Sequence, residues 1–154
     1  MKLLQPGTEA PQFSLPNQHG SQVSLAEFQG SQPVVLIFYP KDATSGCTLE
    51  LHEFNRRRAE FEEFDAALFG ISGDGVDSHQ SFCEAEGYEL SLLADTENSV
   101  RRDYGAQELA GIPGRVTYVI DREGKIAGYC NSAIDMKLHA ARALEILRDL
   151  PAAD

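Results

Sequence analysis

The sequence has 154 residues, of which 42% are hydrophobic, and this length and composition predict one domain spanning residues 1–154 with a sizeable core. The formal net charge of −11 argues against binding nucleic acid or an anionic membrane through a basic surface. No apolar run approaches the roughly 20 residues of a membrane span, and the N-terminal residues lack a signal-peptide pattern. The three cysteines do not form a disulfide framework and suit a reducing compartment, so we expect a cytoplasmic protein.

The first third of the chain predicts a small hairpin and then a buried strand. Residues 13–24 contain the turn-forming Asn17 and Gly20 between two strand-like segments, and Ser24 is a typical N-cap for a short helix over residues 24–28. The run over residues 34–39 is apolar and rich in β-branched and aromatic residues, which is typical of a buried strand.

Helices and strands alternate through the rest of the chain. In order, the expected elements are a helix over 47–64, a strand over 66–72, a helix over 78–86, a weaker strand over 90–94, a helix over 99–104, a hairpin of strands 117–121 and 125–129, and a helix over 135–150. This alternation predicts an α/β protein whose sheet is covered on both faces, and taken alone it allows several three-layer arrangements.

The junction between the strand over 34–39 and the following helix is the most informative segment. Pro40 ends the strand, a loop over residues 41–46 follows, and Cys47 opens the predicted helix. A thiol in the first turn of a helix faces unpaired backbone N–H groups and the positive end of the helix dipole, and both favour the nucleophilic thiolate. A lone cysteine is otherwise often a small buried hydrophobe, and that reading stays open on this evidence alone.

Pro40, Thr44 and Cys47 form the pattern P-x-x-x-T-x-x-C directly after this strand. The pattern resembles the active-site loop of the peroxiredoxins, and the longer string over residues 38–50 is most similar to the peroxiredoxin Q group, also called bacterioferritin comigratory proteins. Residues 7–15 are similar to the N-terminal segment of this family. Residues 114–121 are similar to the strand that brings an active-site arginine, here Arg115, to the cysteine.

The resemblance implies a thioredoxin-like fold, with a central mixed sheet flanked by helices and an N-terminal β-hairpin extension. It also implies an antioxidant thiol peroxidase with Cys47 as the nucleophile. In this reading Arg115 stabilises the thiolate and holds the peroxide, Pro40 shields the site, and the Thr44 hydroxyl with the N–H groups of Gly46 and Cys47 completes the peroxide site.

Each of these residues also has an ordinary structural interpretation. Thr44 is a common turn residue, and Arg115 is equally suited to be an exposed charge at a strand end. Lys41 and Asp42 are interpreted as loop charges, and Glu50 as a residue that caps the helix or orients groups of the loop. The competing cations at positions 56–58 lie two to three turns beyond Cys47 and are expected to be solvated.

Oxidised Cys47 is a sulfenic acid that a second thiol must reduce. His52 stands where many members of the group have that second cysteine, and Ser45 stands where proline is frequent. Members without the nearby cysteine can use one on the helix over 78–86, so the resemblance implies that Cys83 is the resolving thiol, while Cys130 is interpreted as a spectator. Because the two cysteines lie on different predicted helices, we expect a disulfide between them to require local unwinding.

The expected substrates are hydrogen peroxide and organic hydroperoxides, and the expected reductant is thioredoxin, with glutaredoxin as the alternative. An intramolecular disulfide is compatible with a monomer. No cofactor or metal is expected, because the four histidines are scattered and no Cys-x-x-Cys pair is present.

Two other functions compete with the peroxidase. A general thiol-disulfide oxidoreductase would need a Cys-x-x-Cys motif, and Thr44 occupies the place of its first cysteine. A redox-sensing or holdase-type binding protein would use oxidation of Cys47 to expose apolar surface to a partner. The rate of reaction with peroxide separates both from a peroxidase.

Overall fold

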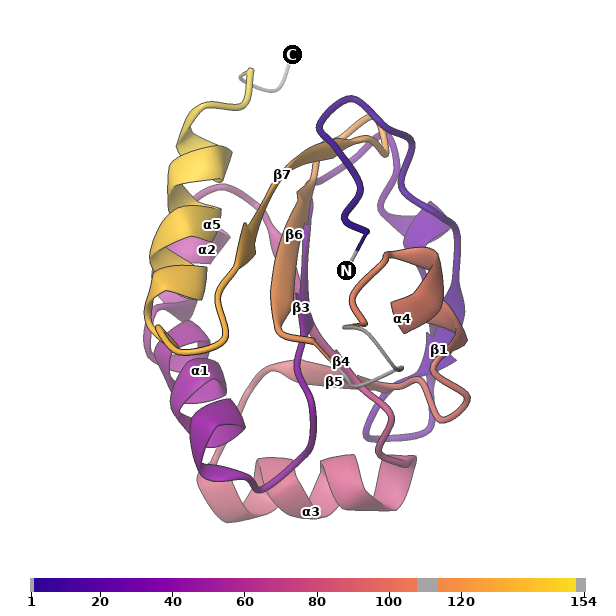
Figure 1. Ribbon diagram of the computed structural model, residues 1–154, viewed down its shortest axis with the longest axis vertical. Helices are drawn as coiled ribbons and strands as arrows, with labels where there is room; N and C mark the ends of the chain where they lie inside the picture. Colours follow the sequence, from indigo (N-terminus) through magenta and orange to yellow (C-terminus); the bar gives the residue numbers. More distant parts are fainter. Residues whose placement is uncertain (1, 108–113, 152–154) are drawn as a thin grey trace.

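The computed structural model describes residues 2–107 and 114–151. At its centre lies a five-stranded mixed sheet with the strand order β5-β4-β3-β6-β7 (Figure 1). The strands are β3 (Val34–Phe38), β4 (Ala67–Ser72), β5 (Ser91–Ala94), β6 (Val116–Ile120) and β7 (Ile126–Asn131). β3, β4 and β5 are parallel, β6 is antiparallel to β3, and β7 is antiparallel to β6. The expected central mixed sheet is therefore confirmed.

An N-terminal hairpin forms a separate two-stranded sheet. β1 (Ser14–Pro16) pairs antiparallel with β2 (Gln22–Ser24), and the 3-10 helix η1 (Leu25–Glu27) follows. The Asn17 side-chain oxygen accepts hydrogen bonds from the backbone N–H groups of His19 and Ser21 at 2.9 and 3.1 Å, which is the turn chemistry expected of asparagine. The predicted hairpin extension is confirmed.

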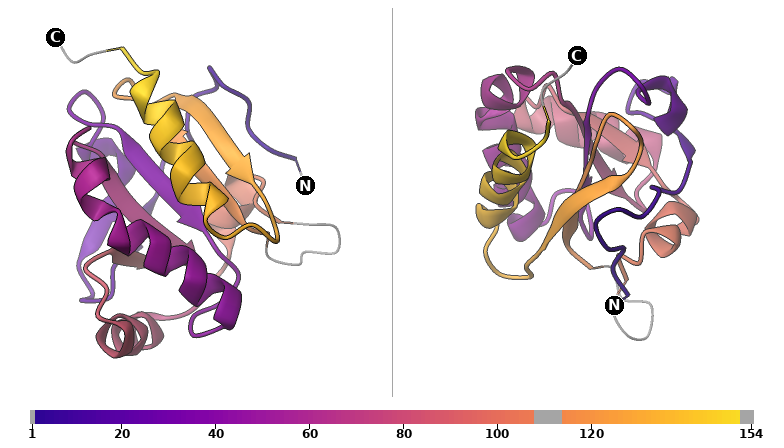
Figure 2. Two further views of the ribbon diagram at one scale, coloured as in Figure 1. Left: turned by 90° about the vertical axis from the view of Figure 1, so that its left-hand side faces the viewer. Right: turned by 90° about the horizontal axis from the view of Figure 1, so that it is seen from above.

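Five α-helices surround the central sheet in the described residues. They are α1 (Ser45–Arg56), α2 (Arg58–Glu62), α3 (Val76–Glu86), α4 (Ser99–Asp103) and α5 (Leu138–Arg148). Figures 1 and 2 show α1, α2 and α5 together on one face of the sheet, and α4 with the N-terminal hairpin on the other. α3 lies across the end of the molecule, below the loop that joins β3 to α1 (Figure 1).

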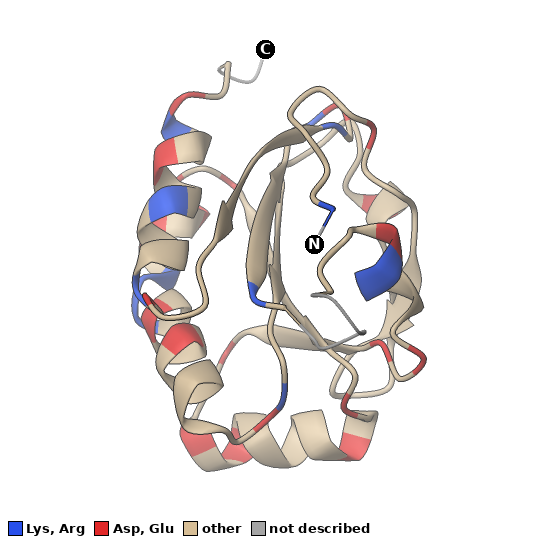
Figure 3. Cartoon of the chain, in the orientation of Figure 1, with Lys and Arg blue, Asp and Glu red and all other residues tan. Residues whose placement is uncertain are grey.

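The side chains of β3 and of Tyr39, which follows it, divide the core between these two faces. Val35, Ile37 and Tyr39 pack with the helices of α1, α2, α3 and α5, whereas Val34, Leu36 and Phe38 pack with α4 and the N-terminal segment. All of them are buried because a strand covered on both faces has no solvent side, which explains its unbroken apolar sequence. Charged residues gather instead on the outer surfaces of the helices and in the loops (Figure 3).

Several predicted helix boundaries are wrong by two or three residues; the helix expected over 78–86, for example, begins at Val76. The helix expected over residues 47–64 begins two residues earlier, at Ser45, and is interrupted at Arg57, whose backbone angles of −99° and 17° are not helical. Because Phe54 and Phe61 are both buried on the two sides of this break, the apolar spacing gives no sign of it. The last helix begins at Leu138 and not at residue 135.

Asp135 precedes the last helix, and its carboxylate accepts a hydrogen bond from the Leu138 N–H at 3.1 Å. In the described parts of the chain, every helix falls short of the length and apolar character that a membrane crossing requires.

Candidate active site

The loop between β3 and α1 places Cys47 in the first turn of α1. Ala43 has a left-handed backbone with φ of 61°, and Thr44 follows as the N-cap residue of the helix. The Thr44 carbonyl accepts the hydrogen bond of the Thr48 N–H at 2.9 Å, which starts the helical pattern. Cys47 is the third residue of the helix, completely buried, where backbone N–H groups lack intrahelical partners.

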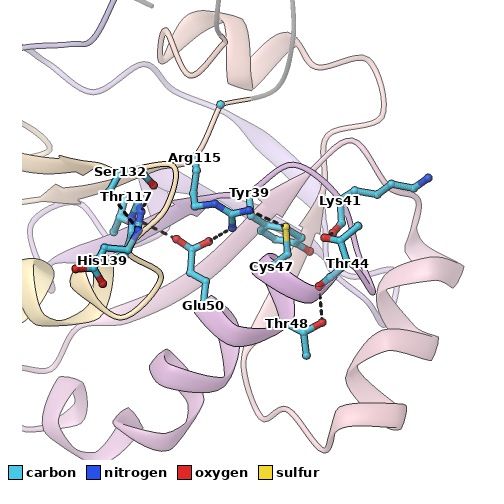
Figure 4. Close-up of polar contacts among 12 residues, drawn as sticks. Tyr39, Lys41, Thr44, Cys47, Thr48, Glu50, Arg115, Thr117, Ser132 and His139 are labelled. Carbon is cyan, nitrogen blue, oxygen red and sulfur yellow. Dashed lines mark hydrogen bonds and ion pairs between the residues drawn. The ribbon is translucent and has the colours of Figure 1, made fainter.

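Arg115 lies immediately before β6 and reaches the Cys47 sulfur. Its Nη2 atom is 3.5 Å from Cys47 Sγ, and its Nη1 atom donates to Glu50 Oε1 at 2.9 Å (Figure 4). The side chain is only 11% exposed, so Arg115 is not a solvated charge at a strand end. One guanidinium therefore joins two residues of α1, Cys47 in its first turn and Glu50 one turn later.

The other predicted site residues lie in the same loop. Thr44 is exposed, and its hydroxyl donates to the Lys41 carbonyl at 2.8 Å. Pro40 is half-buried at the end of β3. Gly46 lies against Arg115, since a Cβ atom at this position would be 3.2 Å from Arg115 Nη2. The approach of the guanidinium to the helix therefore depends on the missing side chain of Gly46.

Glu50 orients Arg115 and does not cap the helix. Its side chain is completely buried, and burial raises the pKa of this carboxyl to about 7 although the ion pair with Arg115 acts in the opposite direction. Its second oxygen, Oε2, is buried without a hydrogen-bond partner and lies 3.3 Å from His139 Nδ1. His139 is also completely buried and comes from α5.

Arg101 is a second buried arginine close to the site. Its guanidinium donates to the backbone carbonyls of Tyr39, of Ala106 at 3.0 Å and of Gly114 at 2.7 Å. Tyr39 precedes Pro40 and Gly114 precedes Arg115, so this one side chain fixes the positions of both segments. Burial lowers the pKa of Arg101 from its ordinary value.

Asp42 is buried as well, and it ties the loop before α1 to α3. Its two carboxylate oxygens accept hydrogen bonds from the Tyr39 hydroxyl at 2.5 Å and the Ser78 hydroxyl at 2.8 Å, and one of them lies 2.7 Å from His79 Nδ1. Burial acts to raise the Asp42 pKa, but the hydrogen bonds of His79 and Tyr39 outweigh it and hold this pKa below its ordinary value. Asp42 is thus a charge of the loop, as expected, but it is buried and hydrogen-bonded.

Cys83 and Cys130 are free and buried, like Cys47. Cys83 lies on α3 and belongs to the same apolar cluster as Cys47, together with Tyr88, whose hydroxyl donates to the Thr48 carbonyl at 3.1 Å. Burial raises the pKa of the Cys83 and Cys130 thiols to about 11, so both are protonated in this conformation.

The arginines at positions 56–58 are engaged elsewhere. Arg56 binds Glu53 at 2.9 Å, Arg57 binds Glu60 at 2.6 Å, and Arg58 binds Glu89 at 2.6 Å. Arg56 is 69% exposed, as expected for a solvated charge, whereas Arg57 and Arg58 are only 20% and 32% exposed.

Sequence reasoning missed four buried residues that support the site. They are Asp42, His79, Arg101 and His139. Charged or titratable residues at positions that the helical spacing assigns to the core are the signal that could have found His79 and His139.

The arrangement joins a buried thiol, a helix start and a fixed guanidinium, which suits nucleophilic chemistry on a small polar substrate.

Comparisons with known proteins agree with this interpretation of the site. The AhpC/TSA family profile matches residues 6–129. The chain is 38% identical over 146 residues to a chloroplastic peroxiredoxin Q of Oryza sativa subsp. japonica, covering 94% of this chain and 67% of the relative. It is 35% identical over 153 residues to the peroxiredoxin Bcp of Bacillus subtilis, covering 94% and 95%.

Solved structures are similar over nearly the whole chain. Peroxidoxin BcpB of Mycobacterium tuberculosis superposes with a TM-score of 0.89 at 35% identity, covering 97% of this chain and 99% of that one. The bacterioferritin comigratory protein of Xanthomonas campestris, whose structures concern alkyl peroxide reduction, gives a TM-score of 0.85 at 27% identity, covering 94% and 98%. The expected thioredoxin-like fold and the resemblance to the peroxiredoxin Q group are thus confirmed.

Proposed function

This chain belongs to the AhpC/TSA family and is a peroxiredoxin, a thiol peroxidase, and we propose that Cys47 is its peroxidatic nucleophile toward hydrogen peroxide and organic hydroperoxides. The observation that carries the proposal is the 3.5 Å contact between Arg115 Nη2 and Cys47 Sγ at a helix start. A guanidinium there stabilises a thiolate, which is the reactive form of cysteine.

In the proposed reaction the Cys47 thiolate attacks the distal peroxide oxygen. The S–O bond forms as the O–O bond breaks, giving a sulfenic acid, and the leaving oxygen takes up a proton to become water or an alcohol. Negative charge shifts onto the peroxide oxygens, where Arg115 and the backbone N–H groups of Gly46 and Cys47 are suited to stabilise it. Thr44 contributes its hydroxyl, and Pro40 limits the access of water.

We further propose that Cys83 resolves the sulfenic acid. The Cys83 thiolate attacks the Cys47 sulfur, a disulfide forms and water leaves. Cys47 and Cys83 share one apolar cluster, which supports their pairing, but the raised Cys83 pKa requires this thiol to leave its buried position before it ionises. Local unwinding around both cysteines is therefore part of the proposal, and Cys130 remains a spectator.

A dithiol donor of the thioredoxin type, or a glutaredoxin, reduces the disulfide by exchange. An intramolecular disulfide needs no second subunit, so we propose that residues 1–154 work as a single monomeric domain. Free cysteines and an acidic composition are compatible with the reducing cytoplasm.

The test is peroxide consumption with thioredoxin, thioredoxin reductase and NADPH. We expect Cys47→Ser to be inactive, Cys83→Ser to undergo a single oxidation without turnover, and Cys130→Ser to match the wild type. Full turnover of Cys83→Ser together with loss of turnover in Cys130→Ser would assign the resolving role to Cys130. Turnover with glutaredoxin and not with thioredoxin would change the reductant while leaving the role of Cys83 intact.

A further inference from the structure

The second carboxylate oxygen of Glu50 is a buried polar atom that lacks a hydrogen-bond partner among the described residues. Oε1 accepts a hydrogen bond from Arg115, whereas Oε2 is buried with no hydrogen-bond partner. An ionised carboxylate oxygen without a partner in such a place is strongly unfavourable. His139 Nδ1 lies 3.3 Å from this oxygen (Figure 4).

The surroundings of His139 define where its protons are. Nε2 lies 2.8 Å from the Ser132 carbonyl oxygen, which can only accept, so Nε2 carries a hydrogen. Nδ1 lies 2.9 Å from the Thr117 hydroxyl and faces Glu50 Oε2. In a neutral imidazole with hydrogen on Nε2, Nδ1 is an acceptor, and it would then oppose the acceptor oxygen of an ionised Glu50.

We propose that Glu50 and His139 hold one proton between them, and that His139 thereby acts as a positioning residue that leaves the charge of Arg115 available to Cys47. Whether the proton resides on Oε2 or on Nδ1, the pair has no net charge and the two atoms attract. The inference rests on the proposed roles of Cys47 and Arg115.

Loss of this proton changes the electrostatics of Cys47. The pair then carries a full negative charge that competes with the thiolate for the same guanidinium, since Arg115 contacts both Glu50 and Cys47. By linkage the effect is reciprocal, so a thiolate at Cys47 increases the proton affinity of the pair, and its conversion to a neutral sulfenic acid decreases that affinity.

In the described part of the chain, five other charged or titratable groups lie near the Glu50–His139 pair. Across the elements packed around it, they are Cys47 on α1, Arg115 before β6, Cys130 on β7, Asp135 before α5 and Arg142 on α5. The two arginines keep their charge, Cys130 is protonated because burial raises its pKa to about 11, and Asp135 is exposed. Cys47 is therefore the group whose ionisation the pair controls.

The first measurement is made on the reduced wild-type protein. Nuclear magnetic resonance follows the imidazole nitrogens of His139 and the side-chain carboxyl carbon of Glu50 across a pH titration. We expect hydrogen on His139 Nε2 throughout, and one common apparent titration in both residues. Independent titrations, or an ionised Glu50 beside a neutral His139 at the pH where Cys47 reacts fastest, would overturn the proposal.

The second measurement is the rate of Cys47 oxidation by hydrogen peroxide as a function of pH. Because the chain has no tryptophan, oxidation is followed by quenched flow and intact mass. We expect the wild-type rate to fall at alkaline pH as the pair loses its proton. This fall in rate should be absent in Glu50→Gln, whose amide mimics the protonated acid. In His139→Gln, which keeps a donor for Ser132 but lacks Nδ1, the midpoint of the fall should lie about one pH unit lower than in the wild type.

His52→Gln is the matched control, because His52 is 51% exposed and binds Glu86 on the surface. Its pH profile should match that of the wild type. Coincident profiles of His139→Gln and the wild type would contradict the inference. Absence of Cys47 oxidation in the wild type at any pH would instead refute the proposed function, and the resonance titration would still report on the pair.

Discussion

At the residue scale, Arg115 acts through the shape of its donor group as well as through its charge. Two of its nitrogens contact Glu50 and Cys47 at the same time, which a lysine ammonium on a flexible stem cannot reproduce. We expect Arg115→Lys to lower kcat/KM for hydrogen peroxide by about 100-fold in the coupled assay, comparable to removal of one anion-stabilising donor.

The control for this charge-conserving change is Arg56→Lys. Arg56 forms a surface pair with Glu53 and is 69% exposed, so its replacement should leave kcat/KM unchanged. Equal activity of Arg115→Lys and the wild type would show that positive charge alone is sufficient.

Gly46 is predicted to affect catalysis without affecting folding. A Cβ atom would lie 3.2 Å from Arg115 Nη2 and 3.7 Å from the Met136 sulfur, so the guanidinium must shift by a few tenths of an ångström. We expect Gly46→Ala to reduce the rate of Cys47 oxidation about tenfold. Stability should not fall, because alanine is favoured over glycine in a helix by about 1 kcal/mol. Gly75→Ala, where a Cβ meets nothing within 4 Å, is the control and should have normal activity.

Glu50 is predicted to make stability depend on pH. Its pKa is raised from 4.5 to about 7, so the folded protein binds this proton more tightly than the unfolded chain. Its contribution is therefore largest below about pH 4.5 and is lost as pH rises to about 7, a difference of about 3 kcal/mol.

Urea unfolding of the reduced wild type and of Glu50→Gln, at about pH 4.5 and about pH 8, measures this effect. The wild type should lose stability relative to the variant as pH rises. His139, whose pKa burial lowers, contributes a slope of the opposite sign. A difference between the two proteins that does not change with pH would contradict the assignment.

Cys47 and Arg115 could be predicted from the sequence because their signals are local motifs after or before a recognisable strand. Their supporting residues could not, since the pairs that matter are distant in sequence: Glu50 and Arg115 are 65 residues apart, and Asp42 and His79 are 37 apart. Burial of these groups follows from tertiary packing, and no periodic pattern specifies which polar residue will meet which.

At the element scale, the Asp42 network holds the loop before α1 against α3. His79 lies with Nδ1 2.7 Å from the Asp42 carboxylate and with Nε2 3.0 Å from the Leu93 carbonyl, so its ring connects the loop to β5. We expect Asp42→Asn to destabilise the reduced protein by about 3 kcal/mol, the typical effect of breaking a buried pair. Hydrogen exchange should accelerate in residues 41–46 and in α3 and remain unchanged in α5.

Ser78→Ala is the graded control, because it removes one hydrogen bond to the same carboxylate and should cost only about 1 kcal/mol. The lowered Asp42 pKa means that the network contributes its full stability above the ordinary aspartate pKa of 3.8, and that this contribution is lost as pH falls below it. Uniform exchange across α3 and α5 in Asp42→Asn would show that the network does not anchor α3 in particular.

The elements themselves followed from the sequence to within a few residues, because buried strands and apolar helix faces leave strong patterns. The break at Arg57 did not, since Phe54 and Phe61 face the core on both sides of it. The strand order was not determined by alternation either. The family resemblance implied a central mixed sheet without a strand order, and the pairing of β3 with β6 joins segments that no local pattern connects.

At the scale of the whole molecule, the burial of all three thiols predicts a simple count. In the reduced native protein the three cysteines should react slowly with a thiol reagent, and in urea all three should react. After one equivalent of hydrogen peroxide, the urea-unfolded protein should show one remaining thiol, at Cys130, identified by mass spectrometry of the labelled peptide. A remaining thiol at Cys83 would contradict the proposed disulfide.

The contacts that close α3 over the β3–α1 loop also have a redox consequence. In the reduced form Asp42 contacts His79, and the Tyr88 hydroxyl donates to the Thr48 carbonyl. Unwinding around Cys47 and Cys83 would break these contacts when the disulfide forms. Interactions present only in the reduced state raise the reduction potential by about 30 mV for each 1.4 kcal/mol. The hydrogen bonds that hold α3 against the β3–α1 loop would thus make the disulfide a stronger oxidant, one that a donor such as thioredoxin reduces readily.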